Sequence, residues 1–448
     1  MTVRASIIIP VWKGRAYLAD CLTALLAELT PEDEIIAVDN ASPDDSAELI
    51  ARDFPIVRLI RSPANRGFSG GCNLGMAAAR GAYCLLLNQD VVVQRGCLAA
   101  LLQALAADER IGIVGGKGLY PDNRVQHAGG RLEWPRGVVA HWGYAQPDGL
   151  WDTPRDVDFV TGAALGMRRA LVERLGPLDE GFWPGYYEDV DYCLRARAAG
   201  YRIRYCPEAV YIHQESTSTE TAARAWYTHR GRLRLSLKHM PPARWRREFV
   251  PAEAAAQPQE VQAGQGRALR LAYQDTARKL PELLRDRPEA DDALFGQMLT
   301  DLQELGRALW RLETLGGRTA LRWPLNPVDL QPDYVQTLQT RQGEAAEPWT
   351  WAGFREYQFR SSLPLVGPLV ARLRRWWFAI AARWAVLFLM QQQEALNRDL
   401  YARIADLMED NLRLAEQLTA REAWEAWRAG GRLPRHPEES GYCQPETD

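Results

Sequence analysis

Short apolar runs alternate with amphipathic stretches over the first part of the chain. Between residue 5 and about residue 116, runs such as SIIIPV, EIIAVD, AYCLLLN and IGIVGG are separated by segments with helical spacing. The runs predict buried strands, and the segments between them, residues 14–28, 42–53 and 71–80, predict helices. Strands that alternate with helices form βαβ units around a mostly parallel sheet. The predicted fold is therefore α/β and Rossmann-like, with helices flanking the sheet.

The pattern changes further along the chain, and these changes predict domain boundaries. The sheet domain is expected to span residues 1–245, with a second half that is dense in aromatic and acidic residues. Residues 246–362 begin with a stretch rich in Ala, Gln and Pro, which predicts a linker and a loosely packed helical region. Residues 363–428 have a helical composition and predict an α-helical C-terminal extension. Residues 429–448 contain too few apolar residues to order themselves.

Two features of the C-terminal extension predict contacts. The segment LPLVGPLVARLRRWWFAIAARWAVLFLM is rich in Trp and Arg, and its apolar stretches are shorter than the ~20 residues that cross a bilayer. Such a helix either makes a peripheral contact in the headgroup region of a membrane or packs its Trp face on the main domain. Further along, spacings of four and three alternate between Leu400, Ile404, Leu407, Asn411, Leu414 and Leu418. Residues 400–418 therefore predict either a parallel coiled coil in a homodimer or an intramolecular helix hairpin.

Composition narrows the class of protein. With 448 residues and 47% hydrophobic content, the chain is long enough for more than one compact unit. A net charge of -3 lacks the concentrated basic charge of nucleic-acid-binding proteins, so no nucleic-acid partner is expected. The seven cysteines are scattered without metal-ligand spacing, which indicates a reducing compartment. The N-terminus carries no recognisable export signal, and we therefore expect a cytoplasmic location.

Polar residues stand where several predicted strands end. Because ligands of open α/β sheets bind outside the carboxyl ends of the strands, Pro10, Asp39 and the triplet Asn88-Gln89-Asp90 are candidates for a site. Asp90 would either bind a hard divalent cation or cap the following turn. Asp39 would either accept a hydrogen bond from a base or a ribose, or cap the turn DNASPDD.

A second acidic group contains three carboxylates within four residues, Glu188, Asp189 and Asp191. Mutual repulsion raises the pKa of a carboxylate and makes it a better base. The alternative is a solvated acidic helix start, because CLRARAAG follows with helical composition. The neighbouring aromatic residues, among them Trp183 and Tyr187, either offer flat faces to sugar rings or belong to a core cluster.

His213 ends another apolar run, AVYIH, and is followed by a basic stretch. Its imidazole would either complete the coordination of a cation on Asp90 or serve a structural role. The basic residues would neutralise a diphosphate, touch an anionic membrane surface or form an ordinary solvated face. They are His229, Arg230, Arg232, Arg234 and Lys238.

Taken in order, six segments between about residues 5 and 240 resemble family-two glycosyltransferases, especially rhamnosyltransferase-like members. They are SIIIPV, VDNAS, NRGFSGGCNLGMAAARG, YCLLLNQD, VTGAALGMRRALVERLGPLDEGFWPGYYEDVDYCLRARAAGYRI and VYIHQESTS. The resemblance implies a GT-A fold, a nucleotide-diphospho-sugar donor and transfer with inversion to a glycan or lipid-linked glycan acceptor. It also implies work in polysaccharide or cell-envelope biosynthesis at the inner face of the plasma membrane, with rhamnose as the suggested sugar.

The resemblance also assigns roles to individual residues. Asp189 of the Glu188-Asp189 pair matches the catalytic base, and Glu188 beside it is also expected in the catalytic site. Asp90 and His213 match ligands of a divalent metal, Mg²⁺ or Mn²⁺. Asn88 departs from the family pattern, which has Asp at this first position of the metal triplet, and the departure weakens the metal assignment. Donor binding falls to Pro10, Val11, Asp39, Asn65, Gly67, Asn88 and Gln89. Acceptor binding falls to Gly162, Trp183 and Tyr187.

A missing motif excludes two other enzyme classes. A dehydrogenase or a nucleotidyltransferase would carry a Gly-rich phosphate loop after its first strand, where this sequence reads IIIPVWKGRAYL. The remaining alternative is a catalytically degenerate module that binds nucleotide sugars or glycans. Loss of Asp189 or Asp90 would favour such a module, and both residues are present.

Overall fold

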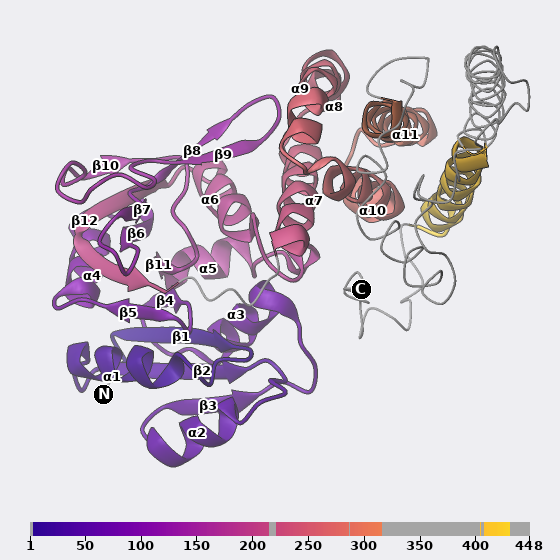
Figure 1. The fold of residues 1–448 in the computed structure, drawn as a ribbon. Coiled ribbons are helices and arrows are strands. Elements are labelled where there is room, and N and C mark those ends of the chain that lie inside the picture. Colours follow the sequence, from indigo (N-terminus) through magenta and orange to yellow (C-terminus); the bar gives the residue numbers. More distant parts are fainter. Residues whose placement is uncertain (1–2, 215–220, 286, 316–403, 405–406, 431–448) are drawn as a thin grey trace, which may run out of the picture. The chain divides into compact units, whose positions relative to one another are not determined.

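The computed structural model describes residues 3–214, 221–285, 287–315, 404 and 407–430 (Figure 1). The chain divides into two compact units, residues 1–310 with 419–446, and residues 311–418 with 447–448. The first unit contains the sheet and every residue to which a catalytic or binding role was assigned above.

A mixed sheet forms the centre of the first unit, with the strand order β10-β12-β6-β11-β4-β1-β2-β3. Two further strands join it, since β5 pairs with β12 and β7 pairs with β6. Its strands are β1 (Ala5–Val11), β2 (Asp33–Asp39), β3 (Arg58–Arg61), β4 (Tyr83–Leu87), β5 (Val91–Val93), β6 (Ile111–Leu119), β7 (Val125–His127), β10 (Arg155–Asp156), β11 (Ala164–Arg168) and β12 (Arg202–His213). A separate hairpin consists of β8 (Gly130–Glu133) and β9 (Val138–His141).

Strand direction brings the candidate residues to one edge. Strands β3, β2, β1 and β4 are parallel, and β6 is parallel to β12. Strand β11 is antiparallel to both of its neighbours, β4 and β6, so that Ala164 at its start pairs with Leu87 at the end of β4. The start of β11 therefore lies at the same edge as the carboxyl ends of the parallel strands. The predicted α/β fold with a mostly parallel, helix-flanked sheet is confirmed.

Helices cover both faces of the sheet. Successive side chains of a strand point to opposite faces, and accordingly Ile7 packs in one apolar cluster with α1, α2 and α4, whereas Ile8 packs in the other with α3, α5 and α6. The helix bounds are α1 (Leu18–Glu28), α2 (Ser46–Asp53), α3 (Gly67–Ala78), α4 (Cys97–Ala107), α5 (Arg169–Leu175) and α6 (Glu188–Ala198), with a short 3₁₀ turn at Glu180–Phe182.

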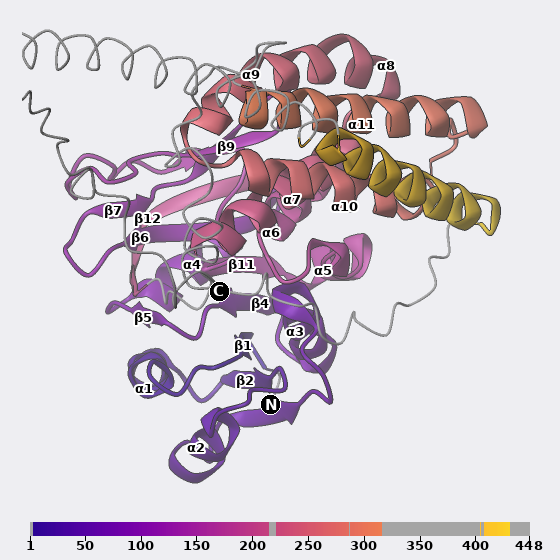
Figure 2. The same ribbon diagram turned by 45° about the vertical axis from the view of Figure 1, so that its right-hand side comes forward.

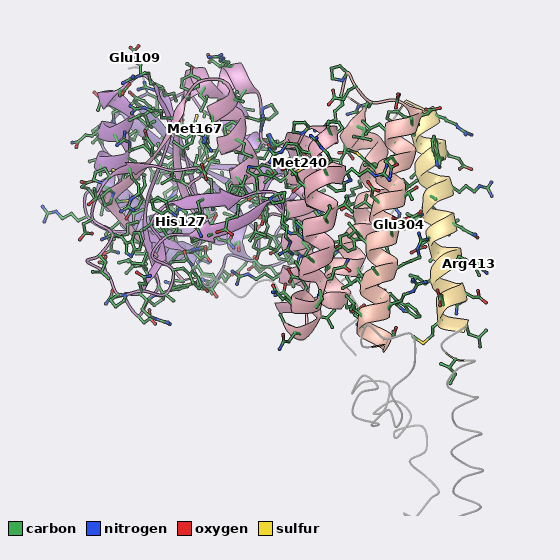
Figure 3. All side chains as sticks on the ribbon, turned by 90° about the horizontal axis from the view of Figure 1, so that it is seen from above. Glu109, His127, Met167, Met240, Glu304 and Arg413 are labelled. Carbon is green, nitrogen blue, oxygen red and sulfur yellow. The ribbon has the colours of Figure 1, made fainter. Side chains whose placement is uncertain are left out.

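A group of helices follows the sheet, and Figures 1 and 2 show α7 and α10 side by side. The helices are α7 (Thr221–His239), α8 (Pro242–Arg244), α9 (Val250–Gln262), α10 (Gly266–Leu284) and α11 (Asp292–Leu315), with a π-helical turn at Trp245–Phe249. They share an apolar core that includes Trp245, Tyr273 and Phe295. Met240, labelled in Figure 3, lies in this core at the end of α7. Within residues 246–362, expected to be linker and loosely packed helix, the described residues include α9 and α10, and some of the side chains of these helices are fully buried.

A helix also covers residues 407–428, and its last part packs within the first unit. The ring of Trp427 stacks on Phe295 at 5.0 Å, and the indole N–H of Trp427 donates to Asp292 at 2.8 Å. The Trp- and Arg-rich segment and most of the tail 429–448 lie outside the described residues. Among the described helices, none is both long and apolar enough to cross a membrane.

Four of the five basic residues on α7 are buried and Lys238 is half-buried and paired, so none of the three interpretations fits this run. Arg232 and Arg234 are 2% and 9% exposed. Arg232 binds Glu253 of α9, while Arg234 and Lys238 bind Asp179. The basic residues were predicted to lie at the surface, because the sequence alone does not show that acidic residues of other elements face α7.

Candidate active site

A carboxylate, an amide and an imidazole meet at the carboxyl edge of the sheet. The triplet Asn88-Gln89-Asp90 follows β4, and pairing of β5 with the end of β12 sets Val91 opposite His213. The Nε2 atom of His213 lies 3.2 Å from Asp90 Oδ1 and 3.3 Å from the amide nitrogen of Asn88. Asp90 is 5% exposed.

The donor set fits a divalent cation. His213 Nδ1 lies 2.8 Å from the side-chain oxygen of Gln126, so Nδ1 donates and the lone pair of a neutral ring is on Nε2. In that state Nε2 and Asp90 Oδ1 are both acceptors, and a cation between them would be bound by both. The buried Oδ1 of Asn88 has no hydrogen-bond partner and can turn toward the same point.

Few protein ligands are available there. Within the described parts of the chain, no group of three or more His, Cys, Asp or Glu side chains could hold a metal. Two protein ligands suit Mg²⁺, which proteins commonly bind through one or two carboxylates while substrate phosphates and water complete the shell. Asn88, which departs from the family pattern, can still offer a side-chain oxygen of the kind that Mg²⁺ binds.

The end of β2 organises the turn that precedes α3. Asp39 Oδ1 accepts a hydrogen bond from the Ser42 backbone, as in a turn cap. Asn40 donates to the side chain of Asn65 at 3.1 Å and to the Gly67 carbonyl at 2.9 Å, and it accepts from the Arg66 backbone. Asn40 was missed in the sequence, although its position directly after the strand-end Asp39 was a signal.

Gly67 allows this turn to approach the loop before the acidic group. Its φ is +69°, and a Cβ there would lie 2.8 Å from Trp183 Cδ1 and 2.9 Å from the Pro184 carbonyl. The Phe68 backbone donates to that same carbonyl at 2.7 Å. Gly67 and Trp183, predicted for donor and acceptor binding respectively, are therefore neighbours. Half-buried Phe68 packs beside Gly162 and was also missed.

Two of the predicted donor-binding residues, Pro10 and Val11, lie at the end of β1, and a third, Gln89, binds the residue that follows this strand. Val11 is buried, and its carbonyl accepts from the Asn40 backbone. Pro10 packs against Gly71 of α3. The side chain of Gln89 forms two hydrogen bonds with the backbone of Trp12, at 2.9 and 2.8 Å. Gln89 thus fixes the chain that leaves β1.

Asp189 lies in the first turn of α6, at the same edge. Gly162, just before β11, donates its backbone N–H to Asp189 Oδ2 at 2.8 Å, and Val190 donates to Oδ1 at 2.8 Å. Burial raises the pKa of Asp189, and these two N–H donors oppose the shift. Asp189 remains partly exposed, so each oxygen keeps a lone pair that a substrate hydroxyl can reach.

Backbone strain precedes this carboxylate. Tyr186 and Tyr187 both have positive φ, 75° and 77°, which is costly for residues with side chains. Tyr187, expected at the acceptor face, is 5% exposed and packs in the core, where it supports the strained turn.

The other two carboxylates of the group differ from Asp189. Asp191 is fully buried and accepts from Lys238, His239 and Arg195, which together hold its pKa below the ordinary value despite burial. Glu188 is 6% exposed, and burial together with the neighbouring Asp189 raises its pKa well above the usual range. The group does start a helix, but these two carboxylates are not solvated.

The comparisons with known proteins agree with this architecture. Residues 6–176 match the family described as Glycosyl transferase family 2. These residues form a family 2 glycosyltransferase domain. The matched residues include the strands from β1 to β11, the turn that precedes α3, and Asp90. Helix α6 and His213 lie after the matched residues in the chain.

Individual relatives are distant. The uncharacterized protein y4gI of Sinorhizobium fredii is 33% identical over 200 residues, 41% of this chain and 21% of its own length. An N-acetylglucosaminyl-diphospho-decaprenol L-rhamnosyltransferase of Mycobacterium tuberculosis is 28% identical over 211 residues, 41% of this chain and 67% of its own length. The chain thus spans only about a fifth of the first of these relatives.

Among solved structures, the mannosyltransferase PcManGT from Pyrobaculum calidifontis, in complex with GDP-Man and Mn²⁺, is similar. It is 18% identical, with a TM-score of 0.40, and the match covers 69% of this chain and 88% of that one.

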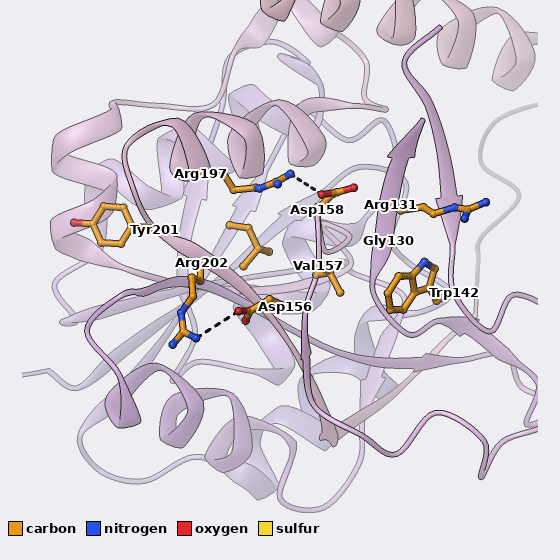
Figure 4. A pocket seen from close by; sticks show the side chains of 10 residues that line it. Gly130, Arg131, Trp142, Asp156, Val157, Asp158, Arg197, Tyr201 and Arg202 are labelled. Atoms are coloured by element: carbon orange, nitrogen blue, oxygen red, sulfur yellow. Dashed lines mark hydrogen bonds and ion pairs between the residues drawn. The ribbon is translucent and has the colours of Figure 1, made fainter. Parts of the chain in front are cut away.

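A cavity of about 310 Å³ in the glycosyltransferase domain lies by the start of β12, the end opposite His213 (Figure 4). Trp142 and Tyr201 are among its lining residues. Asp158 pairs with Arg197 at 2.6 Å and Asp156 with Arg202 at 3.4 Å, while Arg131, which also lines the cavity, pairs with Glu133. None of the lining residues was predicted for the catalytic, donor or metal site.

Replacing Glu188 with Gln should leave kcat close to that of the wild type, because burial and the neighbouring Asp189 favour the neutral form of this carboxyl, which an amide resembles. Folded Glu188 keeps a proton that the unfolded chain releases above pH ~4.3, so this residue lowers stability as pH rises. Glu188→Gln should therefore unfold at an equal or higher temperature at pH 8. A large loss of kcat in Glu188→Gln would show instead that the ionised carboxylate acts in the reaction.

Proposed function

We propose that the chain transfers a sugar from a nucleotide-diphospho-sugar to a hydroxyl of a glycan or lipid-linked glycan, with inversion at the anomeric carbon. The observation that carries the proposal is the position of Asp189. Gly162 holds this partly exposed carboxylate at the sheet edge where Asp90, His213 and Asn88 converge, and the Asn88 backbone in turn donates to the Ala163 carbonyl beside Gly162. The adjacency of Asp189 to these three residues supports the proposal of a base beside a diphosphate site.

In the proposed reaction, Asp189 accepts the proton of the acceptor hydroxyl as that oxygen attacks the anomeric carbon. The bond from this carbon to the diphosphate oxygen breaks on the opposite face, and its electron pair leaves with the nucleoside diphosphate. Asp90 and His213, with Asn88, would hold Mg²⁺ or Mn²⁺. When bound, such a cation stabilises the charge of the departing diphosphate by several kcal/mol.

The donor side of the proposal rests on the end of β2 and on the turn that precedes α3. Asp39, Asn65 and Gly67 lie at the carboxyl ends of the strands, where nucleotides bind in open α/β sheets. Rhamnose is the sugar we propose, because the relative from Mycobacterium tuberculosis is named a rhamnosyltransferase with a diphospho-decaprenol acceptor. Such an acceptor would place the reaction at the inner face of the plasma membrane.

The deciding experiment measures release of nucleoside diphosphate from dTDP-rhamnose, UDP-hexoses and GDP-sugars, with Mg²⁺ or Mn²⁺ and with membrane glycolipid as acceptor. Turnover of one donor supports the transferase, and the anomeric configuration of the product, read by NMR, tests inversion. Tight donor binding without turnover would favour the alternative, a catalytically degenerate binding module.

We also propose that residues 400–418 pair with a second copy of the chain. Within the described residues of this segment, Ile404, Leu407, Leu414 and Leu418 are 42%, 62%, 59% and 59% exposed. A parallel coiled coil would cover this apolar stripe. Light scattering should give a dimer mass for the full chain and a monomer mass for the double variant Leu407→Glu/Leu414→Glu. A monomeric wild type would contradict the proposal.

A further inference from the structure

Strand β7 contacts both halves of the catalytic edge through two adjacent residues. It pairs with β6, with Val125 opposite Leu119 and His127 opposite Gly118. Neighbouring side chains of a strand point to opposite faces, so Gln126 and His127 reach different surroundings. Figure 3 labels His127 within the sheet domain.

Gln126 fixes the ring of His213. Its side-chain oxygen lies 2.8 Å from His213 Nδ1, and a carbonyl oxygen only accepts hydrogen bonds. Nδ1 therefore carries a proton, and in the neutral ring the lone pair is on Nε2, the atom that lies 3.2 Å from Asp90 Oδ1. The orientation that a cation needs is thus set by a residue that would not touch the cation.

His127 fixes the turn that holds Asp189. The Thr161 backbone N–H lies 3.3 Å from His127 Nε2, so this nitrogen accepts and Nδ1 of the neutral ring carries the proton. That proton faces Nδ1 of His141 at 2.8 Å, which accepts it. His127 is 1% exposed, and burial keeps its pKa well below the ordinary value.

The turn at Thr161 and Gly162 contacts Asp189 directly. Gly162 follows Thr161 and donates to Asp189 Oδ2 at 2.8 Å. The rings of His127 and His141 also pack on Phe159, two residues before Thr161, at 5.8 and 5.5 Å. The extended chain from Phe159 to Gly162 is therefore held by the two imidazoles before it meets Asp189.

We propose that β7 is a positioning strand for the transfer reaction, in which Gln126 orients His213 for the metal and His127, paired with His141, orients the turn that carries Asp189. The inference rests on the proposed function, because it uses the assigned roles of His213 and Asp189. It adds three positioning residues, Gln126, His127 and His141. It also predicts that changes within one short strand affect both metal binding and proton transfer.

The Gln126 half is tested by the affinity of the protein for Mn²⁺ alone, measured from the EPR signal of the free ion. Gln126→Leu should bind Mn²⁺ about 10- to 100-fold more weakly, the usual loss when the partner of a ligating His is removed. Gln126→Glu still accepts from Nδ1 and should retain the affinity. Gln146→Leu removes an amide that bonds Trp151 at the surface and serves as the control. Equal affinity in Gln126→Leu and the wild type would overturn this half.

The His127 half is tested by steady-state kinetics. His127→Leu should lower kcat by up to about 10²-fold with the donor KM unchanged, since a displaced base slows the chemical step. The side-chain oxygen of Gln can accept from Thr161, so His127→Gln should recover part of the loss even if His127→Leu folds poorly. Absence of recovery, or an unchanged kcat in His127→Leu, would overturn the positioning role. If the wild type turns over no donor, the proposed function fails, whereas the Mn²⁺ measurement still reports on Gln126.

Discussion

Replacing Asp189 with Asn is expected to lower kcat by about 10²- to 10⁴-fold, the contribution of a positioned general base. Asn keeps the shape and one acceptor oxygen, but it cannot take the acceptor proton. Its amide group must also face one of the two N–H donors, Gly162 or Val190, so a small loss of thermal stability should accompany the kinetic effect. Donor binding should be retained, because Asp189 is on the acceptor side of the reaction.

The pH profile of the wild type gives an independent check. Burial raises the pKa of Asp189, so the acid limb of kcat/KM should lie above the ~3.9 of an ordinary Asp and disappear in Asp189→Asn. Asp158→Asn is the matched control, since Asp158 also anchors a backbone N–H, that of Leu132 at 2.9 Å, but lies by the cavity at the other end of β12. Unchanged turnover in Asp189→Asn would reduce Asp189 to a structural cap of α6.

The parallel half of the sheet could be predicted because its strands are short apolar runs between amphipathic helices. Asp39, Asp90 and His213 each end such a run, and the structure sets these residues at the carboxyl ends of β2, β4 and β12. Strand β11 was not predicted, because ALGMR contains no β-branched or aromatic residue and becomes a strand by pairing with β4 and β6.

The residues that support the site escaped prediction for a similar reason. Gln126 and His127 lie in a three-residue strand without a pattern, and their partners His213 and Thr161 are distant in the chain. The basic residues of α7 were interpreted as surface residues because the sequence does not show which distant residues contact them. Sequence periodicity indicates which face of an element is apolar, but it does not identify the charged partner that a buried cation will meet.

Replacing Glu253 with Gln should destabilise the first unit by about 3–5 kcal/mol, the usual cost of removing one partner of a buried ion pair. Glu253 is fully buried on α9 and accepts from Arg232 at 2.6 and 2.8 Å, from Arg136 at 2.9 Å and from Tyr273 at 2.8 Å. Arg136 belongs to the turn between β8 and β9, so this carboxylate joins the glycosyltransferase domain to the helices behind it. Gln would leave the guanidinium of Arg232 buried without a counter-charge.

The dependence on pH separates this ion pair from a packing defect. Burial alone would raise the pKa of Glu253, but Arg232 and Arg136 outweigh it and hold the pKa at about 2. Stabilisation by Glu253 is therefore complete above the unfolded pKa of ~4.3 and is lost as the pH falls toward 2. Urea midpoints of wild type and Glu253→Gln should differ most near pH 7 and converge on acidification.

Glu260→Gln is the control. It removes one bond to Arg136 at 2.7 Å from a partly exposed side chain and should shift the urea midpoint much less. A gap between wild type and Glu253→Gln that stays constant from pH 7 to pH 3 would mean that shape, and not charge, holds the two parts together.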